Sequence, residues 1–233
     1  MSNQLLLRLG AWCGIGAPIV GMAGFILLAT SGSFVPVSAT EEQVARVLAS
    51  PASQQTFSGL FLESVGQILL LVFVARVWLV LRQAEGELAW LAAAAFGSGL
   101  LLVATGTGAV APEYALALGA GHGLGAPAVW PLHFLNMAFY LESRGFTALF
   151  LALTATVTLQ TRALPRWLGW SGLVLAAANL LSLAMPANDI AQIAPLFFYL
   201  WLLATGIVLL RQPGQRYAAV GGQASMTMAS SSQ

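Results

Sequence analysis

The sequence predicts an all-α fold: a polytopic membrane helix bundle of about six transmembrane helices with a short extracytoplasmic surface helix. The first reason is composition, since 58% of the 233 residues are hydrophobic and only 7% are charged, whereas soluble domains carry about 25% charged residues. The second reason is that polar residues cluster between apolar runs long enough to cross the roughly 30 Å of bilayer hydrocarbon. Lipid is therefore the expected solvent for most side chains.

Six apolar segments are expected to span the bilayer, because each offers about 20 mostly apolar residues. The expected spans are residues 11–30, 57–81, 88–110, 141–160, 167–185 and 193–210. Residues 1–211 are therefore expected to form one transmembrane domain. Residues 212–233 have the small, polar composition of a disordered tail, and we expect that tail in the cytoplasm.

A polar loop at residues 31–55 separates the first two spans. Within it, Thr40 followed by Glu41 and Glu42 is typical of a helix N-cap and an acidic first turn. Val44 and Leu48 then begin and end one apolar face. We expect residues 41–48 to form the short helix on the membrane surface.

The segment before the fourth span is the least determined part of the chain. Residues 119–125 are rich in glycine, which is too flexible for a helix interior. Counting back from Gln160 by one bilayer thickness, about 30 Å, places the outer end of the fourth span near residues 141–145. The sequence leaves open whether residues 112–143 form a re-entrant segment, a surface helix or an extension of the fourth span.

The arginine residues predict the orientation, because cytoplasmic connections of membrane proteins are enriched in basic residues. With the amino terminus inside, only two arginines fall outside, Arg46 and Arg144; those on or near the cytoplasmic side are Arg8, Arg76, Arg82, Arg162, Arg166, Arg211 and Arg216. Most acidic residues fall outside, Glu113 and Glu142 among them. We expect a multi-pass protein of the bacterial inner (plasma) membrane with both termini in the cytoplasm.

Composition also excludes several chemistries. There is no lysine, which excludes a retinal or pyridoxal Schiff base and a phosphate-binding loop that ends in a lysine. Cys13 is the only cysteine, so no intramolecular disulfide can form. His122 and His133 would lie about 16 Å apart on a straight helix, too far to share one metal. We expect no metal, no cofactor and, at a net charge of +1 without a basic tract, no nucleic-acid partner.

The turn between the fourth and fifth spans reads Leu-Pro-Arg-Trp-Leu-Gly-Trp at residues 164–170. Physically, Pro165 sets the turn, Arg166 marks the inner face, and the two tryptophans anchor at the headgroups. This heptad resembles a signature of uncharacterised bacterial multi-pass membrane proteins of domain-of-unknown-function type. The resemblance implies a six-helix bacterial membrane protein and carries over neither an activity nor any catalytic residue.

Polar residues of the fourth span and its preceding extension fall on one stripe. On a continuous helix with 100° per residue, they lie within an arc of about 100°: His133, Asn136, Tyr140, Arg144, Thr147, Thr154 and Thr158. Lipid would penalise such a stripe, so we expect it to face other helices. It is either a polar path or ligand groove, or a set of interhelical hydrogen bonds. Glu142 lies on the opposite side of this helix from His133.

Two polar residues of the second span complete the candidate binding cluster. Glu63 lies about one turn inside the outer end of this span, with Gln67 four residues deeper on the same face. A carboxylate at that depth needs a partner, water or a proton, and we expect Glu63 to pair with Arg144. The alternative is that both side chains extend to the lipid headgroups. The candidate binding cluster is Glu63, Gln67, His133, Asn136, Tyr140 and Arg144.

Small residues predict where helices pack closely. In the first span they recur at three- and four-residue spacing, namely Gly10, Gly14, Ala17, Gly21 and Gly24. Ala93, Gly97 and Leu101 continue a similar pattern in the third span. We expect both faces to pack inside the bundle rather than to form a seam with a second copy of the chain.

The sequence supports two functional hypotheses. The first is a small-molecule or lipid-binding, transporter-like or complex-subunit protein, since no catalytic constellation stands out. The alternative is a membrane enzyme that acts on a lipid or polyprenyl substrate at the outer leaflet, using Glu63, His133, Glu142 or Arg144. The lipid bilayer is the expected surrounding, and either a homo-oligomer or a partner subunit is compatible with the sequence.

Overall fold

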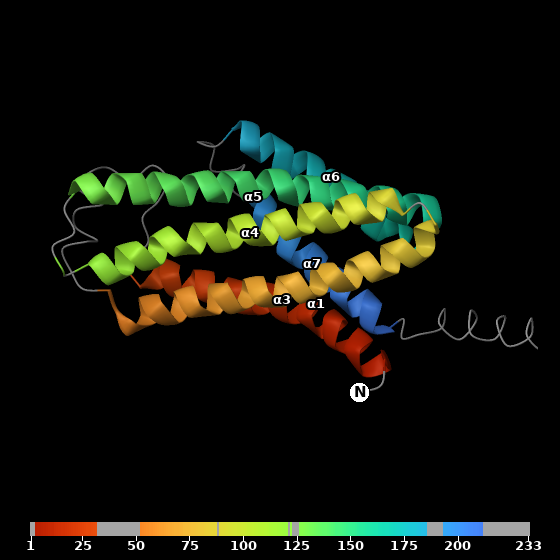
Figure 1. Ribbon diagram of the computed structural model, residues 1–233, viewed down its shortest axis with the longest axis horizontal. Helices are drawn as coiled ribbons and strands as arrows, with labels where there is room; N and C mark the ends of the chain where they lie inside the picture. The colour runs from red at the N-terminus through yellow and green to blue at the C-terminus, as the bar shows by residue number, and fades with distance from the viewer. Residues whose placement is uncertain are drawn as a thin grey trace, which may run out of the picture.

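The computed structural model describes residues 3–31, 52–87, 89–120, 122, 126–185 and 193–211. These residues form six α-helices and no strand (Figure 1). The helices are α1 (Asn3–Thr30), α3 (Gln54–Glu85), α4 (Trp90–Gly119), α5 (Ala126–Thr161), α6 (Arg166–Ala184) and α7 (Ala194–Arg211). The all-α prediction is confirmed for this part of the chain. The expected surface helix at residues 41–48 and the expected tail at 212–233 lie outside the described residues.

Successive helices run in opposite directions and close into a bundle. Helix α1 packs between α3 and α7, α4 packs between α3 and α5, and α6 packs between α5 and α7. The amino terminus, the α3–α4 turn, the α5–α6 turn and the end of α7 all lie at one end, called the turn end below (Figure 1). The opposite end, called the far end, carries the end of α4 and the start of α5.

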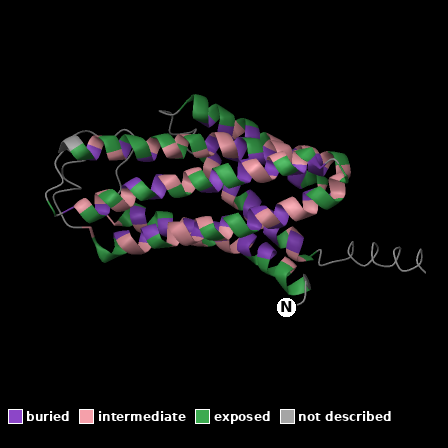
Figure 2. Cartoon of the chain, in the orientation of Figure 1, coloured by how far each residue is buried: buried purple, intermediate pink, exposed green. Residues whose placement is uncertain are grey.

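Five of these helices, α1, α3, α4, α6 and α7, are long and apolar enough to cross a membrane. Many of their large apolar side chains point outward, including Phe61, Ile68, Trp90, Val174 and Leu200, and exposed residues lie along the outer faces of the bundle in Figure 2. An outer surface of this kind is compatible with an integral membrane protein. Helix α5 is the exception, because its polar stripe lowers its mean hydropathy.

Four helices, α1, α3, α4 and α5, are longer than the expected spans, and the extensions of α4 and α5 bear on the polar residues. Helix α4 continues to Gly119 through Pro112, although the third span was expected to end at residue 110. Residues 126–143 are the first half of α5, a continuous helix of 36 residues, so this part of the open segment is an extension of the fourth span. Membrane helices tolerate proline because neighbouring groups satisfy the freed backbone carbonyl, and hydrocarbon thickness does not set where a helix must end.

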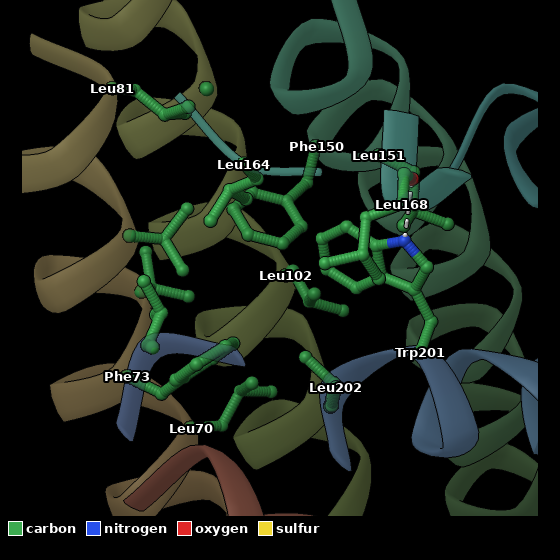
Figure 3. Close-up of a cluster of buried hydrophobic side chains, with 14 of the residues drawn as sticks. Leu70, Phe73, Leu81, Leu102, Phe150, Leu151, Leu164, Leu168, Trp201 and Leu202 are labelled. Carbon is green, nitrogen blue, oxygen red and sulfur yellow. Dashed lines mark hydrogen bonds between the residues drawn. The ribbon is translucent and has the colours of Figure 1, made fainter. Parts of the chain in front are cut away.

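The main hydrophobic core fills the half of the bundle nearer the turn end. Phe73, Phe150 and Leu202 are almost completely buried there, and Figure 3 shows side chains from α3, α4, α5, α6 and α7 meeting in it. The Trp201 ring meets the Phe150 ring edge-on at 87°, with 6.3 Å between the ring centroids. Its Nε1–H donates to the carbonyl of Leu168 at 3.1 Å. A polar contact thus fixes the orientation of the largest side chain in an otherwise apolar core.

The α3–α4 turn is held by an acidic side chain. The Glu85 carboxylate accepts hydrogen bonds from the backbone N–H groups of Leu91 at 3.1 Å and Ala92 at 2.8 Å. These N–H groups belong to the first turn of α4, where backbone N–H groups have no acceptors within the helix itself. Gly86 takes a positive φ of 88° at the turn, a conformation that glycine adopts without steric cost.

The close-packing prediction is confirmed for the first helix. A Cβ on Gly14 would overlap the ring of Phe73, and one on Gly24 would lie 2.8 Å from the Gly59 carbonyl oxygen. The prediction is wrong for the third helix, since a Cβ on Gly97 would meet nothing within 4 Å and Ala93 is exposed. The close contact there is made by Gly99, whose Cβ would press on Val74.

Helix α6 is short and leaves the outer part of α5 uncovered on one flank. A Cβ on Gly145 would lie 3.6 Å from Leu183, one residue before α6 ends. Residues 126–144 of α5 therefore continue past the end of α6 by about 27 Å. The polar residues described next lie mostly in this longer part of the bundle.

Candidate functional site

The polar stripe of α5 faces the inside of the bundle, as expected. His133, Asn136, Arg144, Thr147, Thr154 and Thr158 are all less than one-tenth exposed. Tyr140 is the exception, with 38% of its surface exposed. Glu142 is exposed, so the prediction that it lies away from His133 is also confirmed.

Glu113 and Asn136 join α4 to α5. The side-chain amide of Asn136 donates to Oε1 of Glu113 at 2.9 Å and to the carbonyl oxygen of Ala109 at 2.8 Å. Ala109 is four residues before Glu113, so its carbonyl oxygen and the Glu113 side chain lie on the same face of α4. Continuation of α4 past Pro112 is therefore what brings a second acidic side chain to the stripe.

Glu63 lies on α3, with its carboxyl group within electrostatic reach of Glu113. Its side chain packs against α1, where a Cβ on Gly24 would come within 2.9 Å of Cγ of Glu63. Among the described residues no side chain donates a hydrogen bond to Glu63.

Gln67 lies one helical turn from Glu63 and points at α4. A Cβ on Gly106 would come within 2.8 Å of both Oε1 and Nε2 of Gln67. The Oε1 atom is buried and has no hydrogen-bond partner within the described part of the chain. Gln67 therefore adds an unsatisfied acceptor next to the two carboxyl groups.

Two tyrosines close the cluster toward α7. The guanidinium carbon of Arg144 lies 4.6 Å from the centroid of the Tyr140 ring, a cation–π geometry. Tyr199 of α7 lies within electrostatic reach of both Glu63 and Tyr140. The group beside Glu63 is thus Glu113, and the expected Glu63–Arg144 ion pair is not found among the described residues.

His133 lies one turn from Asn136 on the same buried face of α5. Only 4% of its surface is exposed, and its ring lies 6.1 Å from Trp130 and 6.0 Å from Phe134 between centroids. Neither ring nitrogen has a hydrogen-bond partner in the described ranges. The described residues also include no group of three or more histidine, cysteine or acidic side chains placed to hold a metal.

Sequence reasoning missed Glu113 and Tyr199. Residues 114–118 are apolar and continue the helical pattern of the third span, which was the available signal that α4 extends past Glu113. Tyr199 lies inside an apolar run without a polar neighbour, so only the packing of α7 against α1 brings it to the site. A Cβ on Gly21 of α1 would lie 3.7 Å from the Tyr199 ring and hydroxyl.

The resulting polar cluster consists of Glu63, Gln67, Glu113, Asn136, Tyr140 and Tyr199, with His133 and Arg144 at its two ends along α5. It draws on α3, α4, α5 and α7, and the glycines of α1 give it room. The cluster thus combines two carboxyl groups, the unpaired acceptor of Gln67 and the cation of Arg144, so it offers polar groups of both kinds to a bound ligand.

The comparisons with known proteins give no family for this chain. No protein-family model matches it, and no curated protein and no solved structure shows significant similarity to it.

Proposed function

We propose that this chain is a six-span protein of the bacterial inner membrane that binds a small polar ligand at its polar cluster, in the manner of a transporter or binding subunit. The observation that carries the proposal is the convergence of Glu63, Glu113 and Asn136 from three helices. Buried ionisable groups in a membrane protein are costly for stability and mark ligand or ion pathways. The resemblance of the heptad at residues 164–170 to uncharacterised bacterial multi-pass proteins agrees with this proposal.

The proposed topology has both termini in the cytoplasm. It counts α5 as a span in addition to the five helices that are long and apolar enough to cross a membrane. The amino terminus and the end of α7 lie at the same end of the bundle (Figure 1). That turn end also carries Arg82, Arg162 and Arg166, as expected for the cytoplasmic side. Helix α5 packs between α4 and α6, and its polar stripe is buried there, so its outward faces can meet lipid.

The far end then faces the outside of the cell, and the polar cluster lies toward it. Asn136 is nine residues before Gly145, where α6 ends, which places its backbone about 13 Å beyond that level. A ligand would therefore reach the cluster from the outer side. Buried His133 and exposed Glu142 face opposite ways on α5, so the alternative, an outer-leaflet enzyme, would use Glu63, His133 or Arg144 without Glu142.

Labelling of single cysteines tests this proposal. Cys13 is the only cysteine, so Cys13→Ser gives a background without thiols. In that background, Asn136→Cys is expected to react in spheroplasts with a small membrane-impermeant thiosulfonate. Leu102→Cys, a matched control in the main core, is expected to stay unlabelled until the protein is denatured.

Equal protection of the two cysteines would overturn the proposal of an outer binding site. The topology has its own test with fusions after residue 211. A green fluorescent protein is expected to fluoresce there, and an alkaline phosphatase is expected to be inactive. An active phosphatase would place the carboxyl end outside and reverse the assignment of the two ends.

A further inference from the structure

The outward face of α6 carries a continuous strip of exposed residues, called the α6 strip below. On a helix with about 100° per residue, its members fall within an arc of about 100°: Arg166, Trp167, Trp170, Val174, Ala177 and Leu181. All six are exposed, and the exposed fraction reaches 62% for Trp170 and 68% for Val174. The opposite face of α6 packs against α5 and α7, and α6 lies at the edge of the bundle in Figure 1.

The α6 strip is charged at one end and apolar along the rest. Arg166 begins it at the turn end, and its apolar part runs from Trp170 to Leu181. The apolar part extends about 17 Å along the helix axis, close to half of the roughly 30 Å of hydrocarbon in a bilayer. The α6 strip therefore has the dimensions of one lipid molecule, with a charged position at the membrane boundary and an apolar path one leaflet long.

The charge at the turn end of the α6 strip is positive. The sequence has no aspartate or glutamate between positions 142 and 189, whereas Arg162 and Arg166 are both exposed at the α5–α6 turn. The turn end also carries Glu85 and Glu87, but these belong to the α3–α4 turn, where Glu85 binds the first turn of α4. A guanidinium group offers two parallel N–H donors to a phosphate group, so an anionic headgroup complements this end of the strip.

The α5–α6 turn fixes the backbone positions of the two arginines. Ala163 and Leu164 are buried between them, and the backbone N–H of Ala163 donates to Oγ1 of Thr161 at 3.2 Å. Arg162 has a φ of 58°, a left-handed conformation that residues other than glycine adopt at a cost. An ordered turn loses little conformational freedom when a headgroup binds, which favours a defined site over diffuse attraction.

We propose that the α6 strip binds one anionic phospholipid, with the phosphate group at Arg166 and Arg162 and an acyl chain along the apolar part. The rings of Trp167 and Trp170 lie where the headgroup and the acyl chain meet, the usual position of tryptophan at a membrane boundary. This surface is separate from the polar cluster, and the inference does not rest on ligand binding there. A zwitterionic lipid offers the same acyl chains without the net negative charge, so it separates recognition of the headgroup from general contact with lipid.

The test uses native mass spectrometry of the full-length protein in detergent, with phosphatidylglycerol and phosphatidylethanolamine of the same acyl chains as probes. Phosphatidylglycerol is expected to bind more tightly than phosphatidylethanolamine. Arg166→Gln is expected to weaken its binding about fivefold, the contribution of one arginine at an anionic headgroup. Arg82→Gln is the matched control and is expected to bind like the parent, because Arg82 is exposed at the same end of the bundle and its guanidinium carbon lies 5.3 Å from the centroid of the Trp78 ring.

Three outcomes would overturn the inference: equal binding of the two lipids, equal loss of binding in Arg166→Gln and Arg82→Gln, or displacement of phosphatidylglycerol by millimolar sn-glycerol 3-phosphate. Equal loss in the two variants would show that the turn end attracts anionic lipids as a whole, without a site on α6. Displacement by the soluble headgroup would show that the ligand is a free phosphate compound and not a lipid. Size-exclusion profiles establish that each variant remains folded, as expected for substitutions of exposed side chains.

Discussion

The two halves of the bundle are built differently. Near the turn end, side chains from five helices form one apolar core around Phe73, Phe150 and Trp201 (Figure 3). Near the far end, the apolar packing shrinks to a small cluster of Leu28, Leu60, Val110 and Ala117, and polar side chains occupy much of the space between helices. The chain thus separates the region that holds the helices together from the region that carries the polar cluster.

This difference shows which half of the bundle supplies most of its stability and which half carries groups that lower it. Buried apolar contacts stabilise a bundle, whereas buried carboxyl groups and unpaired amides cost free energy. A protein selected for stability alone would fill the far half with apolar side chains. Substitutions in the turn half should therefore destabilise the fold strongly, and some substitutions of charged groups in the far half should cost almost nothing.

The largest effect is expected from Trp201→Ala in the turn half. The substitution removes the edge-on contact with Phe150 and the hydrogen bond to Leu168, and such truncations cost about 3–5 kcal/mol. Thermal unfolding in detergent measures the loss. The neighbouring Leu200 is 60% exposed, so Leu200→Ala is the control and should change the midpoint little. Equal losses for both would contradict the position of the core.

A smaller loss is expected from Gly14→Ala, which forces a methyl group against the buried ring of Phe73. Overpacking of this kind costs about 1–3 kcal/mol. Gly97→Ala is the matched control, because its methyl group meets nothing within 4 Å and alanine is the better helix former. The same thermal assay should rank the control at or above the parent, and the reverse order would refute the close α1–α3 contact.

In the far half, Asn136→Ala removes the one hydrogen bond that the described residues donate to the Glu113 side chain, and with it the bridge between α4 and α5. Leaving buried acceptors without a donor costs about 1–3 kcal/mol. Asn179→Ala is the comparison, since Asn179 donates only within its own helix, to Leu175. Asn136→Ala should unfold at the lower temperature. If Asn179→Ala proves the more damaging, the α4–α5 bridge is not structural.

The smallest effect is expected from Glu63→Gln. The substitution keeps the side-chain shape and replaces a carboxyl group in a poorly solvated position by a neutral amide, so stability without added ligand should stay within about 0.5 kcal/mol of the parent or rise. Glu85→Gln is the contrasting change, because Glu85 holds the first turn of α4 and its loss should lower stability. A clear drop for Glu63→Gln would assign Glu63 a structural role.

Much of the fold could be predicted because helical periodicity and hydrocarbon thickness act locally. The stripe from His133 to Thr158 was predicted to face inward from its angular spacing alone, and its buried side chains confirm this. Glu113 was missed because a span was assumed to end where the hydrocarbon ends. Gly97 was chosen over Gly99 because spacing shows that small residues recur and does not show which neighbour they face.

Helix α6 ends beside Gly145, while α5 continues for another 19 residues in the direction of the far end. On that flank the exposed side chains of α5 include the apolar Phe134 and Leu135 and the carboxyl group of Glu142. Acyl chains of a bilayer can lie against this flank beside Phe134 and Leu135. Asn136 is nine residues from Gly145 and therefore about 180° around the helix, so in this part of the bundle α5 itself would separate such chains from the polar cluster.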